Sequence, residues 1–249
     1  MTTKENSTRA IRTFVPELSR FRRAQQKTVY QGPLGRIGAT RRSRYTLVAL
    51  SGVLALLALV VSAIISPTVA AAAGLGAVLL IAGGWPAATG IAELRGRHRV
   101  TSHSVIILLS GLASVLYAWI NPGESPLTFL PAIAAVGIVS SFMTELARGE
   151  GAQGKLESVI SCVSGVLASV SVAGWVGLAI LAKHAETAQP VVMIGVGVGI
   201  LLGIIGIRVI SAGPKEGPRR GAVTLGVTPV AFIGVIGYVC ATFLTRVIG

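Results

Sequence analysis

Aspartate is absent from this chain, and all nine acidic residues are glutamates. This absence excludes aspartyl-phosphate chemistry, catalytic triads that use aspartate, and the Asp-rich motifs that hold metal ions against diphosphates or sugar nucleotides. The sequence also contains no GxxxxGK[ST] phosphate-binding loop and no GxSxG nucleophile elbow. The commonest catalytic motifs of soluble enzymes are therefore missing.

Histidine and cysteine are also scarce. None of His98, His103 and His184 is paired at helical spacing with a second metal ligand, so the sequence predicts no metal site. Cys162 and Cys240 both lie inside apolar runs, where a cysteine usually packs as a small hydrophobic residue. We therefore expect no cofactor.

Charged residues are also scarce. Only 12% of residues are charged and 52% are hydrophobic, whereas soluble domains carry about 25% charged residues. Residues 45–92 contain no charged side chain, and the mean hydropathy is +0.75. About 20 helical residues cross the roughly 30 Å hydrocarbon core of a bilayer. The composition thus predicts an all-α integral membrane protein.

Turn signals divide the apolar sequence into seven expected spans. Pro67 divides the first long run into a hairpin, and residues 121–126 form a second turn rich in helix breakers. We therefore predict a basic N-terminal segment, 1–44, and a seven-transmembrane-helix bundle, 45–249. The expected spans are 45–66, 68–93, 103–120, 126–147, 157–182, 189–211 and 222–247.

The basic residues predict the orientation of these spans. Eleven of the 22 Lys and Arg lie in residues 1–44, while Lys183 and Arg246 alone fall on the opposite side. The other nine lie in three alternate loops, 94–102, 148–156 and 208–221. Because cytoplasmic loops carry the excess of Lys and Arg, we expect a cytoplasmic N-terminus and an extracytoplasmic C-terminus in a cell (bacterial inner) membrane.

The net charge of +13 predicts a lipid partner rather than a nucleic acid, because the basic residues flank apolar spans. Within the N-terminal segment, Ile11, Phe14, Leu18 and Phe21 recur at helical spacing among arginines. This pattern predicts a basic amphipathic helix on anionic lipids of the cytoplasmic face. A disordered basic tail is the alternative interpretation.

Ser-Gly pairs occur near the start of three spans that are expected to run outward. They are Ser51-Gly52, Ser110-Gly111 and Ser164-Gly165. One interpretation is a set of parallel hairpin repeats followed by a lone seventh helix. The other is chance recurrence in a chain rich in Ala, Val, Leu, Gly and Ser, and both remain open at this point.

Small residues recur every four positions on the fifth and sixth spans. Such stripes let helix backbones approach closely in a membrane. We therefore expect these two spans to pack against each other, or one of them to meet a partner chain. The candidate packing residues are Ser161, Gly165, Ser169, Ala173 and Gly177 on the fifth span, with Gly195, Gly199 and Gly203 on the sixth.

The second span contains Gly83, Gly84 and Pro86, a combination that predicts a kink. Trp85, between them, is expected at the inner interface, where aromatic anchors collect. A kink can shape a binding cavity, and it can also serve packing alone.

Charged and histidine side chains gather at the cytoplasmic ends of the spans. We expect them to form a surface for lipid headgroups or a protein partner, or else an ordinary interfacial collar of charges. The residues are Glu93, Arg95, Arg97, His98, Arg99, His103, Glu145 and Arg148. On this placement the spans have no ionisable residue in their interior, which disfavours coupling to protons or sodium.

Three functions remain open on this evidence. The leading hypothesis is a non-enzymatic accessory or structural component of a membrane or cell-envelope assembly, in contact with other membrane subunits or with copies of itself. The second is a transporter or flippase for a lipid or neutral solute, which would work with hydroxyls and glycine-broken helices. The third is a membrane-embedded enzyme acting on lipid, with Glu93, Glu145 or a histidine as base.

Overall fold

The computed structural model describes residues 41–90, 97–123, 125–147, 155–184, 197, 200–201, 203–206 and 218–248. Residues 39–249 form one compact unit, and everything below concerns its described part. That part is helical, with short turns and no strand. The predicted amphipathic helix before residue 41 lies outside the described residues and stays a prediction.

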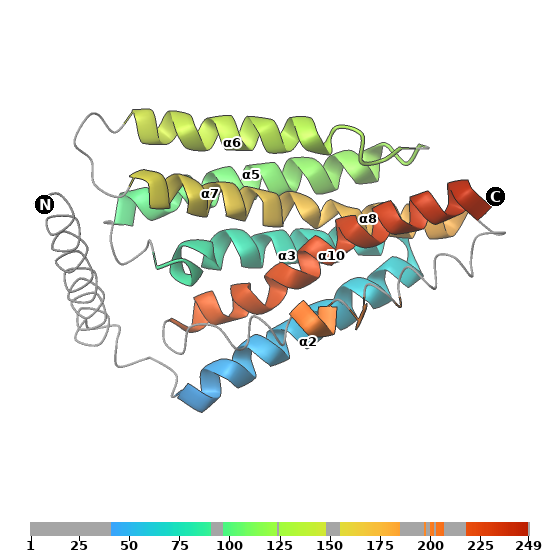
Figure 1. Ribbon diagram of the computed structural model, residues 1–249, viewed down its shortest axis with the longest axis horizontal. Helices are drawn as coiled ribbons and strands as arrows, with labels where there is room; N and C mark the ends of the chain where they lie inside the picture. Colours follow the sequence, from blue (N-terminus) through green and yellow to red (C-terminus); the bar gives the residue numbers. More distant parts are fainter. Residues whose placement is uncertain are drawn as a thin grey trace, which may run out of the picture. The chain divides into compact units, whose positions relative to one another are not determined.

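The described part of this unit contains seven helices with described bounds and the helical residues 197, 200–201 and 203–206 (Figure 1). Neighbouring helices in the chain run in alternate directions up to α7 and α8, which follow each other in the same direction. The helices are α2 (Arg41–Ile65), α3 (Pro67–Ala88), α5 (Arg97–Ile120), α6 (Leu130–Leu146), α7 (Lys155–Ser171), α8 (Ala173–His184) and α10 (Arg219–Ile248).

Five stretches are long and apolar enough to cross a membrane, which agrees with the predicted membrane class. They are Thr46–Ile65, Pro67–Ala88, Ser102–Ile120, Leu156–Lys183 and Arg219–Thr245. The predicted fourth span corresponds to α6, an apolar helix of 17 residues, or about 25 Å. The predicted sixth span, 189–211, lies mostly outside the described residues, so the count of seven stays a prediction.

Helices α2 and α3 form the hairpin that Pro67 predicts. Ser66 separates the two helices in an extended conformation, and its hydroxyl accepts a hydrogen bond from the Val69 backbone N–H at 3.2 Å. Pro67 occupies the first helical position, where its missing N–H leaves no bond unmade. The local chemistry therefore ends one helix and starts the next within a single residue.

The centre of the bundle is the continuous apolar stretch of α7 and α8, the most buried of the five. A turn at Val172 separates the two helices, and the chain continues in the same direction after it. Just beyond this turn, the indole Nε1 of Trp175 donates to the Val230 carbonyl of α10 at 2.9 Å. The bulkiest core side chain thus satisfies its only polar atom on a neighbouring helix.

The structure buries the whole small-residue stripe of the predicted fifth span, now α7 and α8: Ser161, Gly165, Ser169, Ala173 and Gly177. Its predicted contact with the sixth span, which lies mostly outside the described residues, stays a prediction, and its described contacts are with other helices. Gly165 faces Ile107 and Trp85, on α5 and α3, and Gly177 faces Tyr238 on α10. Gly203 lies against Ile233 and Leu56, whereas Gly195 and Gly199 lie outside the described residues.

The glycine–proline segment of α3 is a packing site in the structure. The helix continues through Pro86 to Ala88, and the Cα of Gly84 lies so close to α10 that an added Cβ would be 2.8 Å from the Arg220 carbonyl oxygen. Gly83 faces open space. Trp85, in the last turn of α3, is buried and donates to the Ser161 carbonyl at 2.6 Å, so its indole packs within the bundle, and its place at the inner interface stays a prediction.

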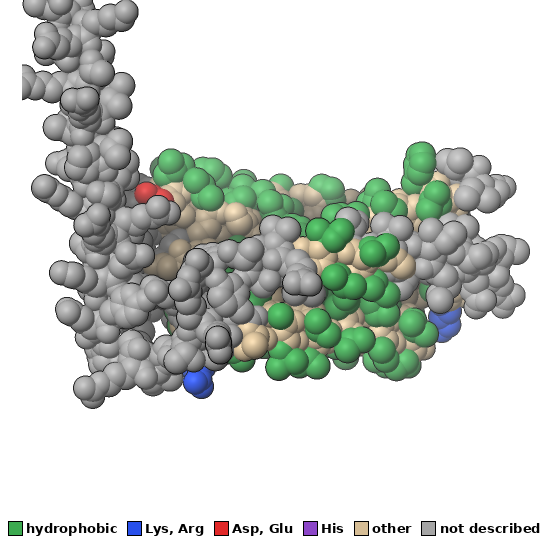
Figure 2. Space-filling view, turned by 60° about the horizontal axis from the view of Figure 1, so that its bottom comes forward, with side chains coloured by type: hydrophobic (Ala, Val, Ile, Leu, Met, Phe, Trp, Pro, Cys, Tyr) green, Lys and Arg blue, Asp and Glu red, His purple; other side chains and the backbone are tan. Residues whose placement is uncertain are grey.

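Large apolar side chains cover the outside of the bundle (Figure 2). On α2 they include Leu50, Leu54 and Leu57, which follow one another at helical spacing on the outer face. Water would penalise a surface of this kind, whereas the hydrocarbon of a bilayer solvates it without cost. The exposed apolar surface and the helix lengths therefore both indicate a membrane environment.

We predict that Gly174→Ala will destabilise the fold by about 1–3 kcal/mol, the usual cost of overpacking. A Cβ at this position would overlap the backbone of Gly234 and Val235 on α10, which cannot move away independently. Gly76→Ala is the matched control, because nothing lies within 4 Å of a Cβ there. Unfolding in mixed detergent micelles measures both, and equal stability of the two variants would contradict the described contact.

Candidate functional site

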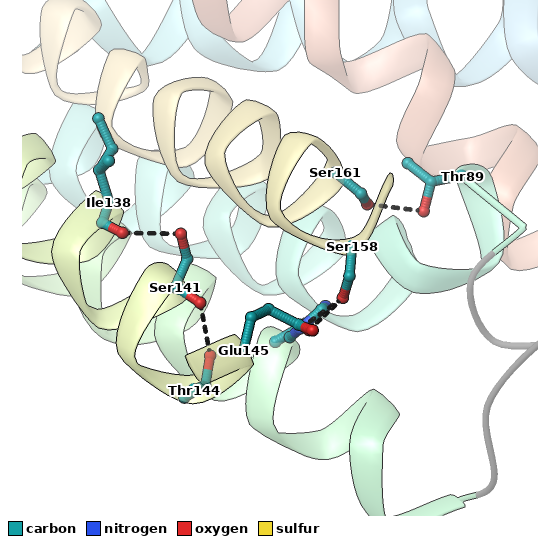
Figure 3. Close-up of polar contacts among 8 residues, drawn as sticks. Thr89, Ile138, Ser141, Thr144, Glu145, Ser158 and Ser161 are labelled. Atoms are coloured by element: carbon teal, nitrogen blue, oxygen red, sulfur yellow. Dashed lines mark hydrogen bonds and ion pairs between the residues drawn. The ribbon is translucent and has the colours of Figure 1, made fainter. Parts of the chain in front are cut away.

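One cluster of ionisable and polar side chains is buried between three helices. His103 on α5, Glu145 on α6 and Ser158 on α7 are 5%, 4% and 0% exposed. The His103 Nε2 atom lies 3.3 Å from Oε1 of Glu145 and 3.2 Å from Oγ of Ser158. The Ser158 hydroxyl donates to the same Oε1 atom (Figure 3).

All three residues lie near the ends of their helices. Glu145 is the last residue but one of α6, and Ser158 is the fourth residue of α7. The carboxyl group of Glu145 therefore lies beside the first turn of α7, where the positive end of the helix dipole favours a negative charge. The fold thus places a hydroxyl donor, an imidazole and a helix N-terminus around one carboxyl group.

The geometry differs from that of a serine nucleophile activated by histidine. In such a relay, the hydroxyl and the carboxylate contact opposite nitrogens of the imidazole ring. Here both the Ser158 hydroxyl and the Glu145 carboxyl contact Nε2 of His103. The arrangement can share a proton among three groups or join three helices, but it does not orient the serine for attack.

A second polar contact lies close by and adds α3 to the same end of the bundle. The Ser161 hydroxyl donates to the Thr89 hydroxyl at 2.9 Å, just beyond the end of α3 (Figure 3). One helical turn earlier, Trp85 donates to the carbonyl of the same Ser161. Polar side-chain contacts therefore join α3, α5, α6 and α7 at this end, in addition to contacts elsewhere such as Trp119 with Thr68.

The predicted headgroup or partner surface needs a correction at two positions. His103 and Glu145 are buried, so neither side chain is available at the surface, although both lie near the ends of their helices. Glu93, Arg95 and Arg148 lie outside the described residues, as do the side chains of Arg97, His98 and Arg99. For these six the surface stays a prediction.

The burial of Glu145 could have been predicted from the helical period of α6. Leu130, Gly137, Ser141 and Glu145 are the buried residues of α6, and they share one face of the helix. A face that combines a glycine, a serine and an acid in an otherwise apolar helix is the one expected to turn inward. Nothing in the sequence marked Ser158, which is one of many serines.

The structure also shows an apolar groove of about 180 Å³ between α3 and α5. Leu79 and Val105 at its rim are 58% and 49% exposed, and Ser104 contributes the only hydroxyl of its lining. The groove opens on the outer apolar surface, where lipid tails are expected. Among the described residues, no group of three or more His, Cys, Asp or Glu side chains is placed to hold a metal ion.

We predict that Ser158→Ala will lower the free energy of unfolding by about 1–2 kcal/mol, the range of an interhelical hydrogen bond in a membrane. The alanine leaves Glu145 without its hydroxyl donor. Ser164→Ala on the same helix is the matched control, because the Ser164 hydroxyl bonds only to the Ile160 carbonyl one turn earlier. Unfolding in mixed micelles measures the free energy of unfolding of both variants. A larger decrease for Ser164→Ala than for Ser158→Ala would refute the role of the cluster.

Comparisons with known proteins assign no family to this chain. No protein-family model matches it. No curated protein and no solved structure matches it either. The function must therefore be inferred from the fold and from the buried cluster alone.

Proposed function

We propose that this chain is a non-enzymatic structural or accessory component of a membrane or cell-envelope assembly. The observation that carries the proposal is the close packing of the central α7 and α8 stretch. Gly174 meets the backbone of Gly234, and Trp175 lies in full burial against Val230. A bundle whose central helix is in backbone contact with its neighbour suits a scaffold that presents surfaces to partners.

The same packing supports a scaffold over a carrier. Carriers hold their substrate near the middle of the bilayer, at broken helices that line a cavity. At the one described break in a span, Val172 is buried, and its side chain lies 3.2 Å from the position of a Cβ added to Gly74 on α3, so the break is closely packed. The hydroxyls of the buried serines of α7 already have protein partners, Glu145 for Ser158, Thr89 for Ser161 and the Ile107 carbonyl for Ser169, and so offer little to a solute.

The orientation and the lipid contacts belong to the same proposal. We place the N-terminus in the cytoplasm, with seven spans in an inner membrane and anionic lipids at the basic loops. The segregation of Lys and Arg in the sequence supports this placement. With short loops on the opposite side, partners would meet the chain laterally in the bilayer or at its basic face.

We expect the tagged full-length chain, extracted in mild detergent, to retain a stoichiometric membrane partner or a second copy of itself. Recovery as a lone monomer in several mild detergents would overturn the proposal. Two matched variants locate a lateral interface: Val53→Trp on α2 and Val136→Trp on α6 both enlarge an exposed apolar side chain. Only the variant that lies in the interface should lose the partner.

One observation favours a second candidate, a membrane-embedded enzyme acting on lipid. Ionisable residues buried in membrane spans frequently mark functional sites, and Glu145 with His103 supplies a carboxyl and an imidazole. Their burial weighs against direct catalysis, because a base must reach the proton that it removes.

Complementation of a deletion strain separates the two candidates. If Glu145 or His103 is a catalytic base, Glu145→Gln and His103→Ala should abolish the deletion-complementing activity while the protein still accumulates in the membrane. We expect both variants to retain the deletion-complementing activity. Ser164→Ala is the neutral control. Loss of the activity at normal protein abundance would favour the enzyme.

A further inference from the structure

Helix α6 is attached to the bundle by a narrow stripe. Of its 17 residues only Leu130, Gly137, Ser141 and Glu145 are buried, and they form a single face. Large side chains elsewhere on the helix, such as Val136 and Phe142, point outward. The helix packs mainly on α5 and α7, at the edge of the bundle (Figure 1).

Burial of apolar surface does little to hold such a helix in a bilayer, because lipid tails solvate apolar side chains as well as the protein does. Close contact and hydrogen bonds between helices must supply the attraction. The close contact is at Gly137, where an added Cβ would lie 2.7 Å from Val166 and 2.5 Å from the Ser110 hydroxyl.

The hydrogen bonds come from one residue. Within α6, the hydroxyls of Ser140, Ser141 and Thr144 donate to carbonyls of α6 itself. Among the described residues, every side-chain hydrogen bond from α6 to another helix involves Glu145, through His103 on α5 and Ser158 on α7. One carboxyl group near the end of the helix thus carries its polar attachment.

We propose that His103, Glu145 and Ser158 form a polar latch that closes α6 against α7, and that α6 separates locally from α7 when the latch is broken. The helix is poised to do so, because it is short, peripheral and held by few buried side chains. Glu145 acts here as a positioning residue whose contacts set how often the interface opens. The proposal is independent of the assembly role argued above.

A native cysteine reports on this interface. Cys162 is fully buried on α7, between Ser158 and Val166 along the same face of the helix. Ser158 contacts Glu145 of α6, and Val166 lies against Gly137 of α6. Docked α6 therefore covers the Cys162 thiol, and opening of α6 should make the thiol reactive.

The experiment measures alkylation of Cys162 by N-ethylmaleimide in native membranes, using the full chain with Cys240→Ser so that only one thiol remains. Glu145→Ala should raise the alkylation rate about tenfold, which corresponds to about 1.4 kcal/mol of latch energy. Because Glu145→Ala also removes a charge that acts on the Cys162 thiol, Ser158→Ala, which keeps the carboxyl group, is the deciding variant. It should give a smaller rise, and no rise would refute the latch. Glu157→Ala, which removes an exposed glutamate of α7, should leave the rate unchanged.

A second reporter distinguishes local opening from general loosening. Ala241, fully buried on α10, is replaced by cysteine in a chain with Cys162→Ala and Cys240→Ser. Under Glu145→Ala this thiol should stay as unreactive as before. The latch is refuted if Cys162 does not respond to Glu145→Ala, if the thiol at position 241 responds equally, or if Glu157→Ala has the same effect.

Discussion

Close approach of helix backbones is the constraint on which this structure depends. Within a bilayer, helices gain little free energy by burying apolar side chains against each other, because lipid tails solvate these side chains equally well. The helices therefore associate through close contact and hydrogen bonds. Gly174 and Gly234 allow this contact between α8 and α10, and Gly84 allows it between α3 and α10. Larger residues at these points would separate the helices that enclose the core.

Polar contacts follow the same logic. Most buried serine and threonine hydroxyls bond to carbonyls, often one turn earlier on their own helix, which satisfies them without joining helices. Other hydroxyls do join different helices: Ser158 bonds to Glu145 and Ser161 to Thr89, while Ser169 bonds to the Ile107 carbonyl and Thr224 to the Leu80 carbonyl. Among the described residues, the contact between ionisable side chains, Glu145 with His103, lies near one end of the bundle.

The sequence predicted the positions of the helices along the chain better than it predicted which helices pack against each other. Uncharged runs and Pro67 were sufficient to place α2 and α3, because span length and proline chemistry are local properties. The residues of the stripe that contains Gly165 are buried, but a four-residue period cannot identify the helix that covers them. The burial of Glu145 and Trp85 was not predicted, because the inside and the outside of a membrane bundle are both apolar and hydropathy does not distinguish them.

The length of α10 has a consequence for the surrounding bilayer. Its apolar stretch, Arg219–Thr245, has 27 residues and measures about 40 Å, whereas the hydrocarbon core is about 30 Å thick. The helix crosses the bundle obliquely in Figure 1, and such a tilt is one way to accommodate the excess length. Because α10 packs on both α2 and α8, a thicker or thinner bilayer would alter the angle between these helices, which makes the bundle's shape responsive to lipid composition.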